Sequence, residues 1–317
     1  MAIHWYPGHM HKAIREMNKI LAEVDLVIEL LDARLPSSSQ NPVIETLRKN
    51  KPSIKILSKS DLADQSTTAL WQAYFEQDAT VKTLTTTLDQ QDKAQKIIRL
   101  CQALVPSKAN ANLHMLVMIA GIPNVGKSTL VNTVSGRKAA KTGNEPAITK
   151  GQQRIKLPEG IILLDTPGIL WPKIENENGG YRLAASGAIK DTAMGIEDVA
   201  FYLAEYLIKK YPTALKDRYD LTELPETEYE FMEAMGARRG CISAGGRVDL
   251  EKASAILVTE FRAGMLGGIT LETPEMIKDE EVIIAQQKQI KEQRDAERKR
   301  KFRSGSRDNQ SPKAPNQ

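Results

Sequence analysis

The stretch GIPNVGKST, residues 121–129, places glycine, lysine and serine where they could wrap a chain of phosphates. It matches G-x-x-x-x-G-K-[ST], in which backbone N–H groups cradle phosphate oxygens. Gly121 and Gly126 would let the backbone turn tightly, Lys127 would reach the terminal phosphates, and Ser128 would ligate Mg²⁺. An apolar run precedes the stretch and a helix-like run follows it, which is the context that such a loop requires. The sequence therefore predicts a nucleotide-phosphate site.

A second stretch, LLDTPGILWP at 163–172, ends an apolar run in an aspartate and a glycine. Asp165 could hold Mg²⁺, mostly through water, and the Gly168 N–H could face a γ-phosphate. Asp-x-Pro-Gly by itself is also a common turn. Nucleotide switches usually carry a glutamine soon after the glycine, but Ile169 follows here. The stretch therefore leaves open which group would position an attacking water.

Base recognition is expected from LSKSD, residues 57–61, which ends another apolar run. Asp61 could accept hydrogen bonds from guanine N1–H and N2–H₂, while the Lys59 stem covers the ring. A buried polar site can reject an analogue that lacks such donors by roughly 10⁴-fold. The same residues could instead cap a helix, because S-x-x-D often begins one. The residues alone leave both interpretations open.

Apolar runs of strand length alternate with helix-like segments through the first half of the chain. This alternation predicts an α/β fold with a parallel, doubly wound sheet. Parallel strands end at one edge, so the three stretches would meet there. The expected strands are 25–33, 53–58, 81–85, 113–121, 153–157 and 160–165, and the expected helices are 12–24, 42–50, 67–77 and 93–105.

The strand pattern stops after Pro172 and a small all-helical region is expected to follow. Its helices are predicted at 181–210, with a break near Gly195, near 226–236, and after the N-cap Asp249. We divide the chain into a nucleotide-binding domain at 1–175, a helical domain at 176–282, and a disordered end at 283–317.

The charge of the chain is concentrated near its end. Residues 286–307 hold nine basic and three acidic side chains, a net charge of +6, although the whole chain carries only +4. Such a segment can contact nucleic acid, or it can be a solvated charged helix that frays.

The composition, with 41% hydrophobic and 26% charged residues, is ordinary for a soluble globular protein. Cys101 and Cys241 show neither metal-site nor disulfide spacing, which indicates a reducing compartment. The first residues lack a signal-peptide core, and no apolar run is long enough to cross a bilayer. We expect a cytoplasmic protein without a membrane partner.

The order of these stretches is unusual, because the base-reading stretch precedes the phosphate loop and DTPG comes last. Together with WYPGHMHKA, DARLPSSSQNP and RRGCISAGG, this order resembles the circularly permuted GTPases, most closely the ribosome biogenesis GTPase A (YlqF) family. The resemblance covers about residues 5–274. It implies GTP hydrolysis during late assembly of the large (50S) ribosomal subunit, contact with rRNA, Mg²⁺ and, in many members, K⁺.

By the same resemblance the GTP site comprises Ser58, Lys59, Ser60, Asp61, Thr87, Leu88, Asn124, Val125, Gly126, Lys127, Ser128, Thr129, Thr149 and Gly168. Ser128, Thr149 and Asp165 would hold Mg²⁺, and Asn124 matches the residue linked to K⁺ dependence. Two positions depart from the family pattern, since Ser58 stands where asparagine is usual and Ala147 replaces a glycine. The guanine-side loop reads TLTTTLD, which places Thr87 and Leu88 there.

The resemblance makes His9 the residue that orients the attacking water, because a neutral imidazole can accept a hydrogen bond. Residue type alone favours the alternative that His9 merely caps the helix that begins near Lys12. Two other functions remain open: a GTP-regulated RNA-binding scaffold with negligible turnover, since the glutamine is missing, and an ATPase, suggested by Ser58.

Overall fold

The protein is described by a computed structural model for residues 8–87, 92–111, 113–136, 153–190 and 194–308. It divides into two units, residues 1–274 and 275–317, which are described separately.

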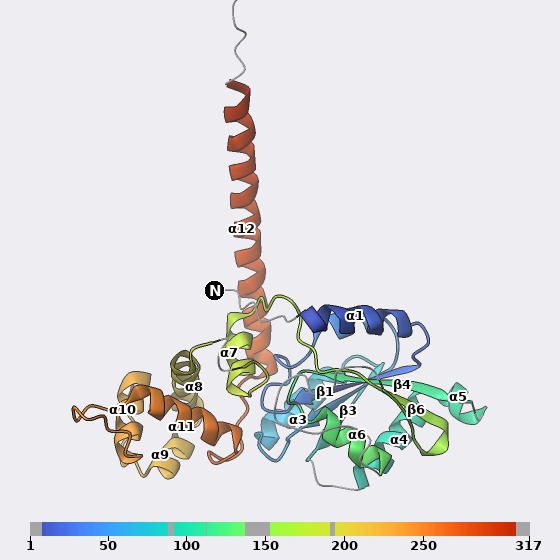
Figure 1. Cartoon of the computed structure of the whole chain (residues 1–317), viewed down its shortest axis with the longest axis horizontal. Coiled ribbons are helices and arrows are strands. Elements are labelled where there is room, and N and C mark those ends of the chain that lie inside the picture. The colour runs from blue at the N-terminus through green and yellow to red at the C-terminus, as the bar shows by residue number, and fades with distance from the viewer. Residues whose placement is uncertain (1–7, 88–91, 112, 137–152, 191–193, 309–317) are drawn as a thin grey trace, which may run out of the picture. The chain divides into compact units, whose positions relative to one another are not determined.

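A six-stranded sheet in the order β3-β2-β1-β4-β6-β5 forms the centre of the first unit (Figure 1). All neighbouring strands are parallel except β5, which runs antiparallel to β6. The predicted doubly wound sheet is confirmed, and β5 is the antiparallel exception at this edge. The strands are β1 (Leu26–Asp32), β2 (Ser53–Ser58), β3 (Val81–Thr86), β4 (Met115–Gly121), β5 (Gln153–Lys156) and β6 (Ile161–Asp165).

Burial explains the position of each strand. Every residue of β1 and β2 is buried, as expected for central strands covered on both faces. In β5 only Ile155 is buried, because this strand lies at the edge. A short 3₁₀ turn, Pro158–Gly160, returns the chain directly from β5 to β6. Such a short connection requires antiparallel pairing.

Helices cover both sides of the sheet, with α1 on one side and α4 and α6 on the other (Figure 1). The apolar side chains of α1 face the core, because Met17 is buried and Ile14 and Ile20 pack against it. Asn41 and Asp64 cap α2 and α3 through their side chains. The helices are α1 (Gly8–Ile20), α2 (Pro42–Arg48), α3 (Gln65–Phe75), α4 (Asp92–Leu104), α5 (Pro106–Asn110) and α6 (Lys127–Ser135).

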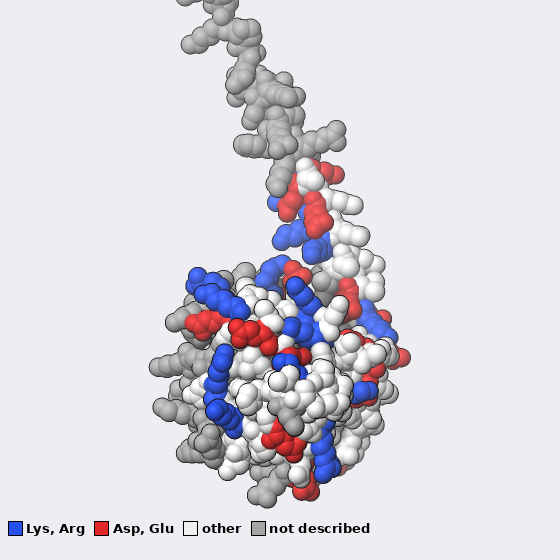
Figure 2. Space-filling model, turned by 90° about the vertical axis from the view of Figure 1, so that its right-hand side faces the viewer, with Lys and Arg blue, Asp and Glu red and all other residues white. Residues whose placement is uncertain are grey.

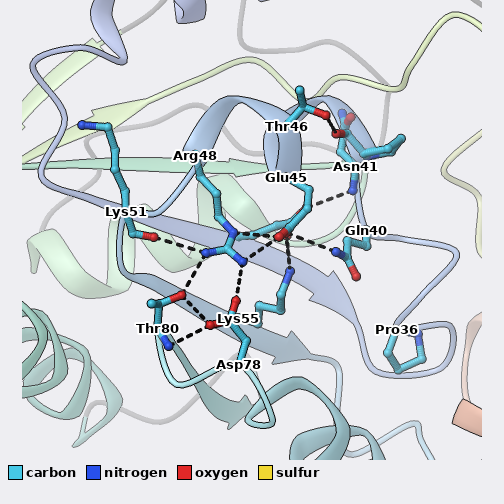
Figure 3. Close-up of polar contacts among 12 residues, drawn as sticks. Pro36, Gln40, Asn41, Glu45, Thr46, Arg48, Lys51, Lys55, Asp78 and Thr80 are labelled. Carbon is cyan, nitrogen blue, oxygen red and sulfur yellow. Dashed lines mark hydrogen bonds and ion pairs between the residues drawn. The ribbon is translucent and has the colours of Figure 1, made fainter.

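A polar cluster centred on Arg48 fastens α2 to the turn before β3 (Figure 3). The Arg48 guanidinium binds Glu45 Oε1 at 2.6 Å and Asp78 Oδ2 at 2.8 Å. It also donates to the Lys51 carbonyl and the Thr80 hydroxyl, both at 3.2 Å. Because Arg48 is buried, its positive charge and its N–H donors need partners inside the protein. Glu45, Asp78, Lys51 and Thr80 provide them near the start of β3.

Among the described residues of the first unit, five further helices follow the sheet: α7 (Glu177–Ala185), α8 (Ile196–Lys210), α9 (Pro212–Tyr219), α10 (Glu228–Arg238) and α11 (Leu250–Arg262). The Asp249 cap is confirmed, since its carboxylate accepts from the Lys252 N–H at 3.1 Å. The expected break at Gly195 is also present, as this residue is the N-cap of α8. The separate helix α9 was not predicted.

A buried carboxylate, that of Glu272, joins the segment after β1 to α7. Glu272 accepts from the Ser38 N–H at 2.9 Å, from the Ser38 hydroxyl, and from Arg182 of α7 at 3.2 Å. Its backbone carbonyl accepts from Trp71 Nε1 of α3 at 3.0 Å. Burial raises the pKa of Glu272, although Arg182 and Ser38 favour the charged form.

The second unit contains almost all of α12 (Pro274–Asp308), a single helix of 35 residues. Disorder was expected from residue 283, but the helix continues to Asp308 because glutamine, glutamate, lysine and arginine dominate and favour helix. Both basic and acidic side chains lie on its described part (Figure 2). Among the described residues, no helix combines the length and apolar character needed to cross a bilayer.

Candidate nucleotide-binding site

The phosphate loop runs from the end of β4 to the start of α6. A side chain at Gly121 would lie 2.8 Å from the Leu30 carbonyl oxygen, so only glycine fits beside β1. Gly126 has a φ of 95° and Asn124 a φ of 58°, both in the left-handed region. Two left-handed residues in one short loop turn the backbone sharply, which can aim successive N–H groups inward. The strand–loop–helix context predicted for this stretch is present.

Lys127 and Asp165 form a buried ion pair across this loop. Lys127 Nζ lies 3.0 Å from Asp165 Oδ1, and the two side chains are 6% and 0% exposed. Burial lowers the pKa of Lys127, and Asp165 opposes that shift. The structure therefore brings together the two residues that were predicted separately from β4 and β6.

An independent observation supports Asp165 as a magnesium ligand. Its second oxygen, Oδ2, is buried and has no hydrogen-bond partner among the described residues. A hard cation prefers oxygen ligands, and carboxylates together with phosphates are its usual partners. Ser128 lies in the first turn of α6, half-buried, and could supply a second oxygen. Thr149, the third predicted ligand, lies outside the described residues.

The DTPG segment is bound tightly to the phosphate loop. A side chain at Gly168 would lie 3.1 Å from Pro123 Cα, so the backbones approach closely there. Ile169 is fully buried, and its N–H donates to the Gly121 carbonyl at 3.3 Å. Its carbonyl accepts from Asn41 Nδ2 at 3.1 Å. Ile169 is thus a core residue that cannot orient a water molecule.

The base-reading stretch begins where β2 ends. Lys59 has a φ of 54°, the Ser60 N–H donates to the Thr86 carbonyl at 3.3 Å, and Asp61 is exposed. Lys59 Nζ is held by Asp32 Oδ2 at 2.9 Å. Helix capping, the alternative interpretation, belongs to Asp64, which accepts from the Thr67 N–H at 2.9 Å. Asp61 therefore remains available to a ligand at the surface.

Ser58 links the base-reading stretch to the phosphate loop. Its hydroxyl lies 2.9 Å from the Leu31 carbonyl oxygen and 2.8 Å from the Val125 carbonyl oxygen. A hydroxyl has one proton, so it cannot fully satisfy both acceptors, whereas an asparagine amide could donate twice. Serine in place of the usual asparagine thus still connects the two loops, but it has only one proton to donate to the two carbonyl oxygens.

A small recess lies between these loops and the end of β3. Ser58, Thr87 and Gly126 line it together with Leu30, Thr86, Lys93, Leu130 and Thr133. Thr87 therefore shares a recess with both predicted loops. Burial lowers the pKa of Lys93, with help from the nearby charge of Lys96 and against the attraction of Asp61.

Asn124 connects the phosphate loop to the helical region. Its Nδ2 donates to the Gly187 carbonyl at 2.8 Å. A monovalent cation at this residue would therefore have to be held by Oδ1, the acceptor end of the amide.

Known proteins resemble the chain along most of its length. A family model described as a 50S ribosome-binding GTPase matches residues 116–220. The protein named ribosome biogenesis GTPase A from Bacillus pumilus is 44% identical over 281 residues, covering 87% of this chain and all of that relative. This chain belongs to the ribosome biogenesis GTPase A family. The protein of that name from Thermotoga maritima is 32% identical over 86% of this chain and 95% of its own.

A solved structure of this family has the same fold. The crystal structure of GNP-bound YlqF from T. maritima is 26% identical, with a TM-score of 0.59 over 84% of this chain and 99% of that chain. Mitochondrial ribosome-associated GTPase 1 of Mus musculus is 31% identical over 84% of this chain and 89% of its own. The circularly permuted order of the loops is thus that of the ribosome biogenesis GTPase A family.

Three of the predicted site residues are not described in full. Leu88 and Thr149 lie outside the described residues, and His9 lies in α1 with only its backbone described. Three residues without a predicted role also lie beside the site: Asp32, Arg34 and Lys93. Asp32 ends a buried strand at the same sheet edge as Ser58 and Asp165, and that position was the available signal.

Proposed function

We propose that this chain is a GTPase that binds and hydrolyses GTP as an assembly factor in late maturation of the large (50S) ribosomal subunit. The observation that carries the proposal is the buried Lys127–Asp165 pair, beside a base-reading loop at the same sheet edge. Membership in the ribosome biogenesis GTPase A family supports the biological role. We place the protein in the cytoplasm, with the subunit precursor and its rRNA as partners.

The phosphate loop would bind the nucleotide through its backbone. The N–H groups from Asn124 to Thr129 would surround the phosphates, and Lys127 would leave Asp165 to reach the β- and γ-phosphates. Ser128, Thr149 and Asp165 would hold Mg²⁺, which neutralises phosphate charge when bound. Asn124 Oδ1 would face K⁺ in the same site, since Nδ2 is directed to Gly187.

The base would be read by the loops after β2 and β3. Asp61 would accept from guanine, the Lys59 stem would lie over the ring, and Ser58 would hold the two loops together. Thr87 lines the recess, and Ser60 and Leu88 would complete the contacts to the base.

The attacking water needs a group other than Ile169, which is buried. We assign this role to His9, near the start of α1, with the Gly168 N–H facing the γ-phosphate. Contact with the large subunit would bring the segment that carries His9 into position, so that hydrolysis is slow alone and stimulated on the subunit. Activating partners can accelerate GTPases by up to ~10⁵-fold.

The decisive experiment compares His9→Ala with the matched control His11→Ala in single-turnover GTP hydrolysis, with and without purified large subunits. His9→Ala should keep GTP binding and subunit binding yet lose most stimulated hydrolysis, whereas His11→Ala should retain it. Full stimulated turnover in His9→Ala would remove the histidine from the mechanism. Wild-type protein that binds GTP without turnover on subunits would instead favour the GTP-regulated scaffold.

A further inference from the structure

A buried cluster of three charges lies directly behind the base-reading loop. Asp32 Oδ2 accepts from Arg34 Nη2 at 2.8 Å and from Lys59 Nζ at 2.9 Å. Asp32 Oδ1 accepts from Arg34 Nε at 2.9 Å and from the Arg34 N–H at 3.1 Å. Asp32 and Arg34 are each 1% exposed, whereas Lys59 is 17% exposed. The carboxylate therefore anchors the tip of Lys59 from inside the protein.

Charge balance does not require Lys59 in this cluster. Arg34 already neutralises Asp32 through two parallel hydrogen bonds, the strongest geometry for such a pair. A second cation on the same carboxylate leaves the cluster with a net positive charge. Burial would raise the pKa of Asp32, but Arg34 and Lys59 hold that pKa well below its usual range. Asp32 is thus a permanent anion with one oxygen shared by Lys59.

The carboxylate is itself held in place by the helical region. The Arg34 guanidinium lies over the Phe261 ring of α11, 5.0 Å from its centroid. The Arg34 backbone carbonyl accepts from the Leu271 N–H at 2.7 Å. The Asp32 N–H donates to the Ser39 hydroxyl at 3.0 Å. These contacts fix the anchor point before any ligand reaches Lys59.

We propose that Asp32, held by Arg34, is a positioning residue for nucleotide-base recognition, which fixes the Lys59 side chain so that its stem forms a ready platform for the guanine ring. This inference rests on the proposed GTP binding. Both ends of Lys59 are fixed, since its backbone has a φ of 54° and its ammonium binds Asp32. A flexible lysine would have to be ordered by the base, and ordering a long side chain weakens binding.

The test is a double-mutant cycle on the full chain, with the dissociation constants of GTP and ITP measured. Asp32→Asn should weaken GTP binding about tenfold, the usual effect of leaving one long side chain to be ordered on binding. Lys59→Met should cause a similar loss, because methionine has a comparable stem but cannot bind Asp32. In the Lys59→Met background, Asp32→Asn should have little further effect. GTP and ITP should weaken alike, since the stem contacts the ring rather than the 2-amino group.

Two further variants keep the test decisive if Asp32→Asn folds poorly. Lys59→Arg retains a cation and a long stem, so it should bind GTP within about threefold of wild type, while Lys59→Met does not. Asp78→Asn, which removes an ion-pair partner just before the start of β3, at the other end of the strands from Lys59, should leave GTP affinity unchanged. Equal losses from Asp32→Asn in both Lys59 backgrounds, or equal affinities of Lys59→Arg and Lys59→Met, would overturn the inference. Wild-type protein without GTP affinity would overturn the proposed function instead.

Discussion

The pair formed by Lys127 and Asp165 connects stability to ligand binding at the scale of single residues. Lys127 compensates a carboxylate that is completely buried, and the same ammonium is expected to contact phosphate. Removing one partner of a buried pair leaves an uncompensated charge, which typically costs about 3–5 kcal/mol. The site is therefore expected to be sensitive to any single change of charge.

Lys127→Met should lower the free energy of unfolding by about 3 kcal/mol or more and should abolish GTP binding. The double variant Lys127→Met with Asp165→Leu should recover most of the stability, because paired hydrophobic replacements are often neutral, and should still not bind GTP. Urea unfolding without nucleotide, together with GTP titration, separates the two effects. A single variant as stable as wild type would show that the ion pair does not stabilise the fold.

At the scale of helices and strands, the correct predictions were of features that the local sequence pattern determines. The six strands and the cap at Asp249 follow from apolar periodicity and capping chemistry. The direction of β5 could not be derived, because pairing depends on the short return through Pro158–Gly160. Helix α9 follows α8 with only Tyr211 between them, and only Leu215 and Tyr219 of α9 are buried, so its local sequence carried too little apolar pattern to predict it.

Contacts between segments far apart in the sequence also could not be predicted from local sequence pattern. Asp32 lies 27 residues before Lys59, and Arg34 meets Phe261 across 227 residues. The sequence indicated that strand ends would meet at one sheet edge, but it did not indicate which charged side chains would pair there. The buried position of Ile169 fits its residue type, whereas its hydrogen bond to Asn41 required the fold.

The Arg48 cluster gives the corner between α2 and β3 a defined pH dependence (Figure 3). Hydrogen bonds from Thr80 and the charge of Arg48 lower the pKa of Asp78 to about 2. Since the folded pKa lies below the unfolded value, Asp78 contributes stability above pH about 4, which is lost as the pH falls toward 2.

Asp78→Asn should therefore be less stable than wild type at pH 6 by roughly 0.5–1 kcal/mol, the size expected for a partly exposed pair. The difference should shrink between pH 4 and pH 2. Unfolding free energies at pH 6, 4 and 3 measure it, and Thr80→Ala should remove part of the same pH-dependent difference. A difference that stays constant with pH would mean that Asp78 is not the titrating group.

At the scale of the whole molecule, the proposed GTP site is joined to the helical region within the first unit. The base-reading loop is bound directly, because the Leu62 carbonyl accepts from the Ile269 N–H at 3.0 Å and the Asp64 N–H donates to Thr270 Oγ1 at 3.1 Å. The phosphate loop is bound through Asn124 and Gly187. The proposed GTP and rRNA contacts on these two regions are therefore expected to influence each other's affinity.

The second unit is expected to supply a separate, electrostatic part of subunit binding. Residues 286–307 carry a net charge of +6, and each neutralised phosphate contributes about −0.7 to the salt slope on single-stranded RNA, so the segment would add roughly −4.

Replacing Lys288, Lys291, Arg294 and Arg298 by glutamine keeps good helix formers and should flatten the slope by about 3. The matched variant with Glu292, Asp295 and Glu297 changed to glutamine should bind at least as tightly as wild type. Affinity for large subunits measured from 50 to 200 mM KCl tests both, and an unchanged slope in the first variant would mean that α12 only keeps the protein soluble.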